Sequence, residues 1–402
     1  EAAAVLPSKS GLGGQKAIGG RWTAEACYAY KGQGYMWQND YANAKVELAK
    51  VINSGKYELW DKTATMGPSS YGTNMQLAKS QNENWSDGSE EYEYLTLYRA
   101  EADFCDEFLL ELDIDGDMTT ITSTEPYWFR AYMNWRKDEV NLPGNTTTAS
   151  DGWGFINPTR TFGYAFAKHD GNSVRRRAAI ATYSEVYHDF PYLNKDVRGV
   201  MSSMLFENEG YFRMKYYDYV DDVVPERFAS GQTNGNRTNF PLMRYADVLL
   251  LYAEAVCMSG EGTANISGLE ALNKVRRRAG LTDAPALDMD NAEYGIKAER
   301  RFELWLEDCS RYVDLIRWGD YKKFITDTSI DGVSEHWGNE CAWLVGLKDA
   351  TKRTTDPTDW SNYEVRYDPL STRGTWSDRF YLWPFPYAET TQNPNLDQNT
   401  GW

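Results

Sequence analysis

Cysteine and histidine are scarce in this sequence of 402 residues, and their scarcity excludes several kinds of site. The five cysteines are widely scattered, with no CxxC pair among them: Cys27, Cys105, Cys257, Cys309 and Cys341. The sequence therefore predicts neither a disulfide framework nor a zinc site. The three histidines are isolated, and no HExxH, GxSxG or Cys–His motif accompanies them. We expect no metal, no cofactor and no catalytic residue built on these side chains.

Basic residues and long apolar runs are also lacking. The 42 basic residues are outnumbered by 59 acidic ones, which gives a formal net charge of −17. Nucleic acids and anionic membrane surfaces attract basic faces, so this charge argues against both as partners. No apolar run approaches a membrane-spanning length. The first residues, EAAAVLPSKSGLGG, lack the basic start and the apolar segment of a secretion signal.

Aromatic residues, in contrast, are abundant. They make up 14% of the chain and include 15 tryptophans and 28 tyrosines. Tryptophan and tyrosine are amphipathic, and they suit surfaces that grip flat, half-polar ligands. The length is compatible with one large domain or with two closely packed layers. Composition alone therefore favours a ligand-binding surface carried on a single large core.

The order of local patterns divides the chain into three regions. Residues 1–60 contain two helical segments, RWTAEACYAYKG and DYANAKVELAKVINSG, which resemble a tetratricopeptide-type hairpin. Residues 61–240 consist mostly of long loops, with strands expected at CDEFLLELDID and YFRMKYYDYV; loops this long are usually functional. Residues 241–402 return to helix at Pro241 and continue through an insertion to an ordered tail. The predicted fold class is mainly α, with tetratricopeptide-like hairpins supporting a loop-rich region that has a few short strands.

The tail, YLWPFPYAETTQNPNLDQNTGW, keeps aromatic residues that a free tail usually loses. Leu382, Trp383 and Phe385 alternate with residues of a different kind, which predicts extended chain pinned to a surface. The asparagines and aspartates that follow indicate turns.

Several of these segments, taken in order, resemble one family. They are SGKYEL, GWGFINPTRTFGYAFAKHDGNSVRRRAAI, RYADVLLLYAEA, LNKVRRRAGL, ERRFELWLEDCSRYVDLIRWG and the closing LWPFP…NPNLDQNTGW. Together they are similar to the SusD/RagB family of outer-membrane nutrient-binding lipoproteins. The resemblance implies a non-enzymatic protein, lipid-anchored at the cell surface, with its tail laid over the helical body. It also implies a partner, a SusC-like TonB-dependent transporter, to which the protein delivers captured glycan.

The resemblance does not extend to the N-terminal features of such a protein. Family members begin with a secretion signal, a lipid-modified cysteine and a first group of helices, whereas Cys27 falls within a predicted helix. We therefore expect the chain to lack an N-terminal part of ~100 residues or more.

The candidate ligand-binding residues are aromatic side chains in the loops, together with one arginine. They are Tyr127, Trp128, Arg130 and Trp135 in PYWFRAYMNW, then Trp153, and Trp337 in the later insertion. An aromatic ring covers the apolar C–H face of a sugar, while polar groups satisfy its hydroxyls. The other interpretation of these tryptophans is that they belong to the core. A peptide-binding member of the same family, a glycoside hydrolase using two carboxylates, and a protein-interaction scaffold remain alternatives.

Two acidic motifs have structural interpretations. In ERRFELWLED, predicted as a helix, Glu299, Glu303 and Glu307 fall on one face. We favour ion pairs with nearby arginines over acid–base catalysis; the arginines are Arg300, Arg301, Arg311 and Arg317. DIDGDMTT lacks the glycine and glutamate spacing of an EF-hand loop, so an acidic strand end is favoured over a calcium site.

Overall fold

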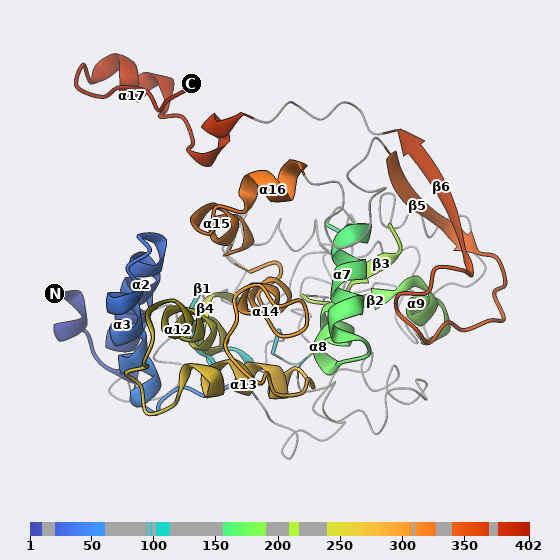
Figure 1. Cartoon of the computed structure of the whole chain (residues 1–402), viewed down its shortest axis with the longest axis horizontal. Coiled ribbons are helices and arrows are strands. Elements are labelled where there is room, and N and C mark those ends of the chain that lie inside the picture. Colours follow the sequence, from blue (N-terminus) through green and yellow to red (C-terminus); the bar gives the residue numbers. More distant parts are fainter. Residues whose placement is uncertain are drawn as a thin grey trace, which may run out of the picture.

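Helices dominate the structure, a computed structural model shown in Figure 1. It describes the following residues: 1–9, 21–60, 94, 97–98, 102–112, 156–189, 209–216, 239–307, 310–326, 340–369 and 377–402. The strands in these ranges form three two-stranded antiparallel sheets. The predicted mainly α fold class is confirmed. Across these ranges, no helix has both the length and the apolar character needed to cross a membrane.

The N-terminal hairpin follows a short 3-10 turn, η1 (Ala2–Ala4), and consists of α2 (Ala24–Trp37) and α3 (Tyr41–Asn53). Side chains cap both helices at their N-termini, as Thr23 accepts from the Ala26 amide and Asp40 from the Asn43 amide. The predicted end of the first helix near Gly32 is wrong, because the helix continues to Trp37. Gly32 lies where α2 meets α3: a Cβ there would lie 2.7 Å from Leu48 Cγ. This glycine therefore permits close helix packing and does not end the helix.

The central helix α12 (Tyr245–Ser259) packs against the N-terminal hairpin and against the helices that follow it in the chain, and it is almost wholly buried. The prediction that this helix begins at Pro241 is wrong. Residues Phe240–Arg244 form strand β4, which pairs with β1 (Phe108–Leu112). The expected strand in CDEFLLELDID is thereby confirmed.

Four further helices surround α12 or continue from it, and their ranges are α13 (Gly268–Arg278), α14 (Ile296–Glu303), α15 (Ser310–Arg317) and α16 (Tyr321–Thr326). The predicted helix over ERRFELWLED is wrong in its second half, because α14 ends at Glu303. Leu304 leaves helical geometry, and Leu306 adopts a φ of 62°, a left-handed conformation that is strained for a leucine. Glu307 therefore lies beyond the helix.

The middle region contains more helix than its composition suggests. Its elements are α7 (Arg160–Asp170), α8 (Val174–Ala179), β2 (Ile180–Thr182), α9 (Tyr183–Asp189) and β3 (Tyr211–Arg213). Strand β3 pairs with β2 and confirms the strand expected in YFRMKYYDYV. The prediction of loops is wrong for 160–189. Helix α7 packs tightly on β3, since a Cβ at Gly163 would lie 2.2 Å from Tyr211 Cδ2.

After α16 come the hairpin β5 (Glu340–Leu347) with β6 (Tyr363–Pro369), then η8 (Asp378–Tyr381) and α17 (Tyr387–Gln392). The tail was predicted to be extended over Leu382, Trp383 and Phe385 and to be pinned to a surface. The tail is extended at Leu382, as predicted, but it is not packed down. It contains α17, and its apolar side chains are exposed, Trp383 by 75%. It folds on itself: Trp402 Nε1 donates to the Leu382 carbonyl at 2.9 Å. Figure 1 shows α17 set apart from the helical body. Other residues of the tail contact α15 and α16, among them Trp383, whose Nε1 lies 3.1 Å from Tyr312 Oη, and Tyr381, whose ring lies against that of Tyr321.

Candidate functional site

The predicted ligand-binding residues share one outcome. All six lie outside the residues that the structure describes: Tyr127, Trp128, Arg130, Trp135, Trp153 and Trp337. They remain predictions. The segment that holds five of them leaves the described structure after Leu112, at the end of β1, and rejoins it at Ile156. Strand β1 is paired with β4, and Ile156 packs against a buried hydrophobic cluster, so both ends of the segment are fixed to ordered elements.

The later insertion also contains Trp360, which lies within the described residues. This side chain is partly buried and lies 5.7 Å from the Tyr211 ring, between ring centroids. The Arg160 guanidinium lies over its ring at 4.8 Å. A Cβ at Gly210 would lie 2.5 Å from the Trp360 ring. Trp360 therefore packs against the core.

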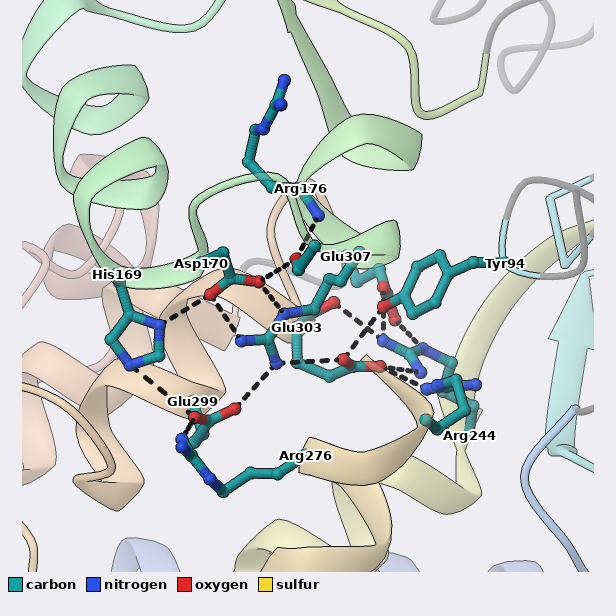
Figure 2. Close-up of polar contacts among 12 residues, drawn as sticks. Tyr94, His169, Asp170, Arg176, Arg244, Arg276, Glu299, Glu303 and Glu307 are labelled. Carbon is teal, nitrogen blue, oxygen red and sulfur yellow. Dashed lines mark hydrogen bonds and ion pairs between the residues drawn. The ribbon is translucent and has the colours of Figure 1, made fainter. Parts of the chain in front are cut away.

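Charged side chains meet in a buried network where α7, α8, α12, α13 and α14 converge (Figure 2). Three carboxylates of the ERRFELWLED segment form its centre: Glu299, Glu303 and Glu307. Their residues are 0%, 0% and 6% exposed, respectively. A buried charge is costly unless it is paired and hydrogen-bonded, so the partners of each carboxylate decide what the network does.

Glu299 ties α14 to α8 and α13. Its carboxylate accepts from Arg175 Nη1 at 2.7 Å and from Arg276. Arg175 also forms a two-pronged pair with Asp170, through Nε and Nη2 at 2.9 Å each. His169 Nδ1 lies 2.6 Å from Asp170 Oδ1. One chain of contacts thus links the end of α7, the start of α8 and the buried face of α14.

Glu303, one turn later, ties α14 to β4 and α13. Arg244 Nη1 donates to its Oε1 at 2.8 Å, Arg278 donates to the same oxygen, and the Tyr94 hydroxyl donates to Oε2 at 2.9 Å. Arg244 and Arg278 both donate to Glu107 as well, each at 2.7 Å. Two arginines and two glutamates thereby close a ring of ion pairs.

Glu307 extends the network beyond the end of α14. Arg244 reaches it through Nε at 2.5 Å and Nη2 at 2.9 Å. The ammonium of Lys215 also pairs with it, and the Tyr98 hydroxyl donates to it at 3.0 Å. Glu307, just beyond α14, is therefore fixed by two cationic side chains and by a tyrosine hydroxyl.

Arginines keep these carboxylates ionised. Burial would raise the pKa of Asp170, but Arg175 and His169 outweigh it, and the pKa falls to about 2. Burial likewise opposes the arginines at Glu303 and Glu307, yet the pKa of each lies below its ordinary value. Burial lowers the pKa of Lys215 to about 8, with Glu307 acting in the opposite direction. With such low pKa values, the carboxyls of Asp170, Glu303 and Glu307 hold no proton to donate near neutrality, so these three groups do not act as general acids.

The predicted ion-pair role of the segment is confirmed for Arg300 and Arg317, which pair with carboxylates around the helix. Arg300 pairs with Asp247 at 2.6 Å and with Asp314 at 2.8 Å, and Arg317 pairs with Glu254. Arg301 and Arg311 lie over aromatic rings.

The main partners of the three glutamates come from other elements and were missed. They are Arg175, Lys215, Arg244, Arg276 and Arg278, together with the acidic Glu107 and Asp170. A signal for some of them was present in the sequence. The VRRRAA and KVRRRAG segments each place consecutive arginines in a short helix, so at least one of them must face inward when the helix is covered.

A groove of about 570 Å³ opens beside the network, between α7, α14, α15 and α16. Phe302 and Phe324 line it together with charged side chains from these helices. Among the residues that the structure describes, no group of three or more His, Cys, Asp or Glu side chains is arranged to hold a metal ion.

The sequence model of the SusD family matches residues 106–402, which is most of the chain. The chain belongs to the SusD family. The resemblance seen in the sequence is thereby confirmed.

Named proteins that are similar to this chain support its assignment to the family. A SusD-like protein of Bacteroides ovatus is 28% identical over 166 residues, which are 40% of this chain and 29% of that protein. The crystal structure of a SusD-like protein from Bacteroides fragilis has a TM-score of 0.62 and is 20% identical, covering 100% of this chain and 69% of its own. Surface glycan-binding protein A from Bacteroides thetaiotaomicron, in complex with laminarihexaose, has a TM-score of 0.56 and 18% identity, covering 98% and 67%.

The sequence identities and the coverages limit what these comparisons show about the chain. At 18% and 20% identity, the two solved structures establish the fold. The chain spans about two thirds of their lengths, and the curated match spans 29% of its relative.

Proposed function

We propose that this chain belongs to a non-catalytic glycan-binding protein of the outer cell surface. It captures oligosaccharides or polysaccharide fragments and passes them to a SusC-like TonB-dependent transporter. The observation that carries the proposal is the match of most of the chain to the SusD family, joined to an aromatic-rich sequence between Leu112 and Ile156. A solved relative that binds laminarihexaose supports a glycan as the ligand.

The aromatic segment supplies the chemistry that a glycan requires. Tyr127, Trp128, Trp135 and Trp153 offer flat apolar faces, and Arg130 offers donors for hydroxyl groups. Several weak stacking contacts give modest affinity with fast exchange, which suits a protein that hands its ligand on. The net charge of −17 favours neutral polymers over long polyanions.

The scaffold supplies the rigidity. The ion-pair network fixes α7, α13 and α14 to β4 through buried arginines, and β4 carries β1, from which the segment starts. A site mounted on fixed elements loses less conformational entropy when a ligand binds. The network's part in this function is to position the loops.

Affinity electrophoresis tests the proposal. The purified chain is run through native gels cast with individual neutral polysaccharides, laminarin included. We expect retardation in at least one gel, relieved by Trp153→Ala and by Trp128→Ala. The matched control is Trp37→Ala, because Trp37 is 55% exposed at the end of α2 and belongs to the scaffold. It should leave the retardation unchanged.

Two other outcomes would overturn the proposal. Absence of retardation in every gel, with an intact circular dichroism spectrum, would favour a peptide ligand. Release of reducing ends from a retained polysaccharide, abolished by substitution of a carboxylate, would instead show a hydrolase.

A further inference from the structure

The C-terminal tail, whose helix α17 stands apart from the helical body in Figure 1, exposes two aromatic rings. Trp383 is 75% exposed and Tyr387 is 81% exposed. Within the described part of the chain, no other ring stacks on either of them and no cation lies over them. Leu382 and Phe385 continue the same apolar stretch and are 59% and 38% exposed. Exposed apolar side chains that are grouped in this way mark a binding surface.

Side chains from the end of the tail hold the backbone of this stretch. Gln398 brackets Phe385, because its Oε1 accepts from the Phe385 amide at 2.7 Å and its Nε2 donates to the Phe385 carbonyl at 2.9 Å. The Asn399 side chain donates to the Trp383 carbonyl at 2.5 Å. The two prolines of LWPFPY each fix a further backbone dihedral. The rings are therefore mounted on a backbone that has little freedom left to lose when a ligand binds.

The indole of Trp383 is oriented by a hydrogen bond although its ring is exposed. Its Nε1 donates to Tyr312 Oη of α15 at 3.1 Å. The Tyr312 ring lies edge-on against that of Tyr321 in α16, with centroids 5.2 Å apart. An exposed side chain without such a bond moves among its rotamers. Trp383 instead keeps its polar edge bonded to the body and its ring open to solvent, which suits stacking on a ring-shaped ligand.

The chemistry of the stretch suits a neutral ligand. No charged residue lies between Arg379 and Glu389, in a chain of which 25% is charged. Even in fully extended chain, the four steps from Trp383 to Tyr387 span at most ~14 Å. Neighbouring units of one oligosaccharide cover such a span, and each unit has an apolar C–H face that an aromatic ring can cover.

We propose that Trp383 and Tyr387 form a second glycan platform, on which a neutral oligosaccharide chain stacks. The choice of a glycan rests on the proposed function, whereas the stacking surface itself rests on the tail. Two exposed stacking contacts bind weakly, so the platform alone does not slow the protein in a polysaccharide gel. Its contribution is to hold a second stretch of a polymer that the aromatic segment around Trp153 has already bound, which raises the overall affinity for long chains.

The indole N–H resonances of the purified chain test the platform directly. The ¹⁵N-labelled chain is titrated with laminarihexaose, which a solved relative binds, and with maltohexaose as a second neutral glucan. The Trp383 signal is assigned by its absence from the spectrum of Trp383→Phe. We expect it to shift progressively with at least one glucan, in the wild type and in Trp153→Ala alike. The signal of Trp37, which is 55% exposed on α2, should not move. A Trp383 signal that does not move with either glucan would overturn the proposal.

Three variants separate stacking from simple exposure of apolar surface. Trp383→Ala combined with Tyr387→Ala should weaken the binding of a retained polysaccharide roughly three- to tenfold, measured by gel retardation. Trp37→Ala, which removes an exposed indole from the scaffold, should not weaken it. Tyr312→Phe keeps every ring but removes the acceptor that orients the Trp383 indole, so the affinity of the platform for the glucan should fall roughly two- to fivefold. Wild-type binding by the double variant would contradict the platform.

The two proposals fail separately. A Trp383 signal that shifts, without gel retardation of the wild type, would leave the platform standing and remove glycan capture by the aromatic segment. Retardation that Trp153→Ala relieves, with an unmoved Trp383 signal, would remove the platform alone. The exposed tail could also join two copies of the chain. A dimer that sedimentation detects in the wild type and not in the Trp383→Ala, Tyr387→Ala variant, without any response to glucan, would assign the surface to that contact and overturn the proposal.

Discussion

Glu303 lies among three arginines, Arg175, Arg244 and Arg278, and its side chain has no exposed surface. A buried set of ion pairs adds little net stability over well-packed apolar side chains, because desolvation offsets most of the attraction. Removing one partner is different, because the charges left behind are buried without compensation. The network therefore makes the fold sensitive to single substitutions at positions that never touch a ligand.

Replacing Glu303 by alanine tests this directly. We expect a loss of about 3–5 kcal/mol in the free energy of unfolding, measured by urea denaturation. The control is Glu270→Ala, which removes the exposed pair with Arg277 and should cost less than about 1 kcal/mol. Similar small losses in both variants would show that the buried network does not hold the helices together.

At the scale of elements, the periodicity of apolar residues and the capping residues at helix ends predicted those helices that local interactions stabilise. Helices α3 and α13 begin beside capping Asp40 and Ser267, and their apolar faces are readable in the sequence. The errors have long-range causes. Strand β4 pairs with β1, more than a hundred residues earlier in the chain, so no local pattern separates Phe240–Arg244 from the helix that follows.

The same limit applies to the network and to the candidate site. Arg175 and Arg244 reach α14 from distant segments, and sequence spacing does not indicate such partners. The ligand residues were proposed from aromatic composition and family resemblance, and they lie outside the described residues. Composition indicates which chemistry is available, whereas the arrangement of loop side chains depends on tertiary contacts that have no periodic signature.

Two glycines of α2 make a matched test of hairpin packing. Gly32→Ala places a Cβ against Leu48 and should destabilise the protein by about 1–3 kcal/mol. Gly34→Ala meets no atom within 4 Å and should stabilise it by about 0.5–1 kcal/mol, because alanine favours helix. Thermal unfolding of both variants gives the comparison. The packing described for α2 and α3 would be wrong if Gly32→Ala were as stable as Gly34→Ala.

Acid should loosen the contacts between α7, α8 and α14. The folded-state pKa of Asp170 is about 2, below its ordinary 3.8, and those of Glu303 and Glu307 are also lowered. Groups of this kind stabilise the fold above their unfolded pKa, and this stabilisation is lost as the pH falls through the folded pKa. The free energy of unfolding should therefore decrease as the pH is lowered from about 4.5 to about 2.

Asp170→Asn isolates one contribution to this acid response. The shift of its pKa corresponds to about 2 kcal/mol of stability near neutral pH. The variant should be less stable at pH 7 and should lose less stability than the wild type on acidification. Lys215 does not confuse the measurement, because its pKa of about 8 places its titration above neutrality. Parallel pH curves for the variant and the wild type would contradict the assignment.

At the scale of the whole molecule, the helical body and the proposed binding segment have different roles under the proposed function. Buried ion pairs and the apolar faces of α3, α12 and α13 hold the helical body together. The family match extends from residue 106 to the end of the chain, so it includes α12 and α13 of this body and the aromatic segment, but not the N-terminal hairpin. Under the proposed function, substitutions in the body change stability, whereas substitutions in the aromatic segment change affinity.

One measurement tests the central claim most directly. The migration of Trp153→Ala is compared with that of wild type and of Trp37→Ala, in a native gel that contains a polysaccharide known to slow the wild type. The account predicts that Trp153→Ala migrates as fast as in a gel without polysaccharide, with an unchanged unfolding midpoint, while Trp37→Ala is slowed like the wild type. Retardation of Trp153→Ala equal to that of wild type, or its loss in Trp37→Ala, would contradict glycan capture by the aromatic segment.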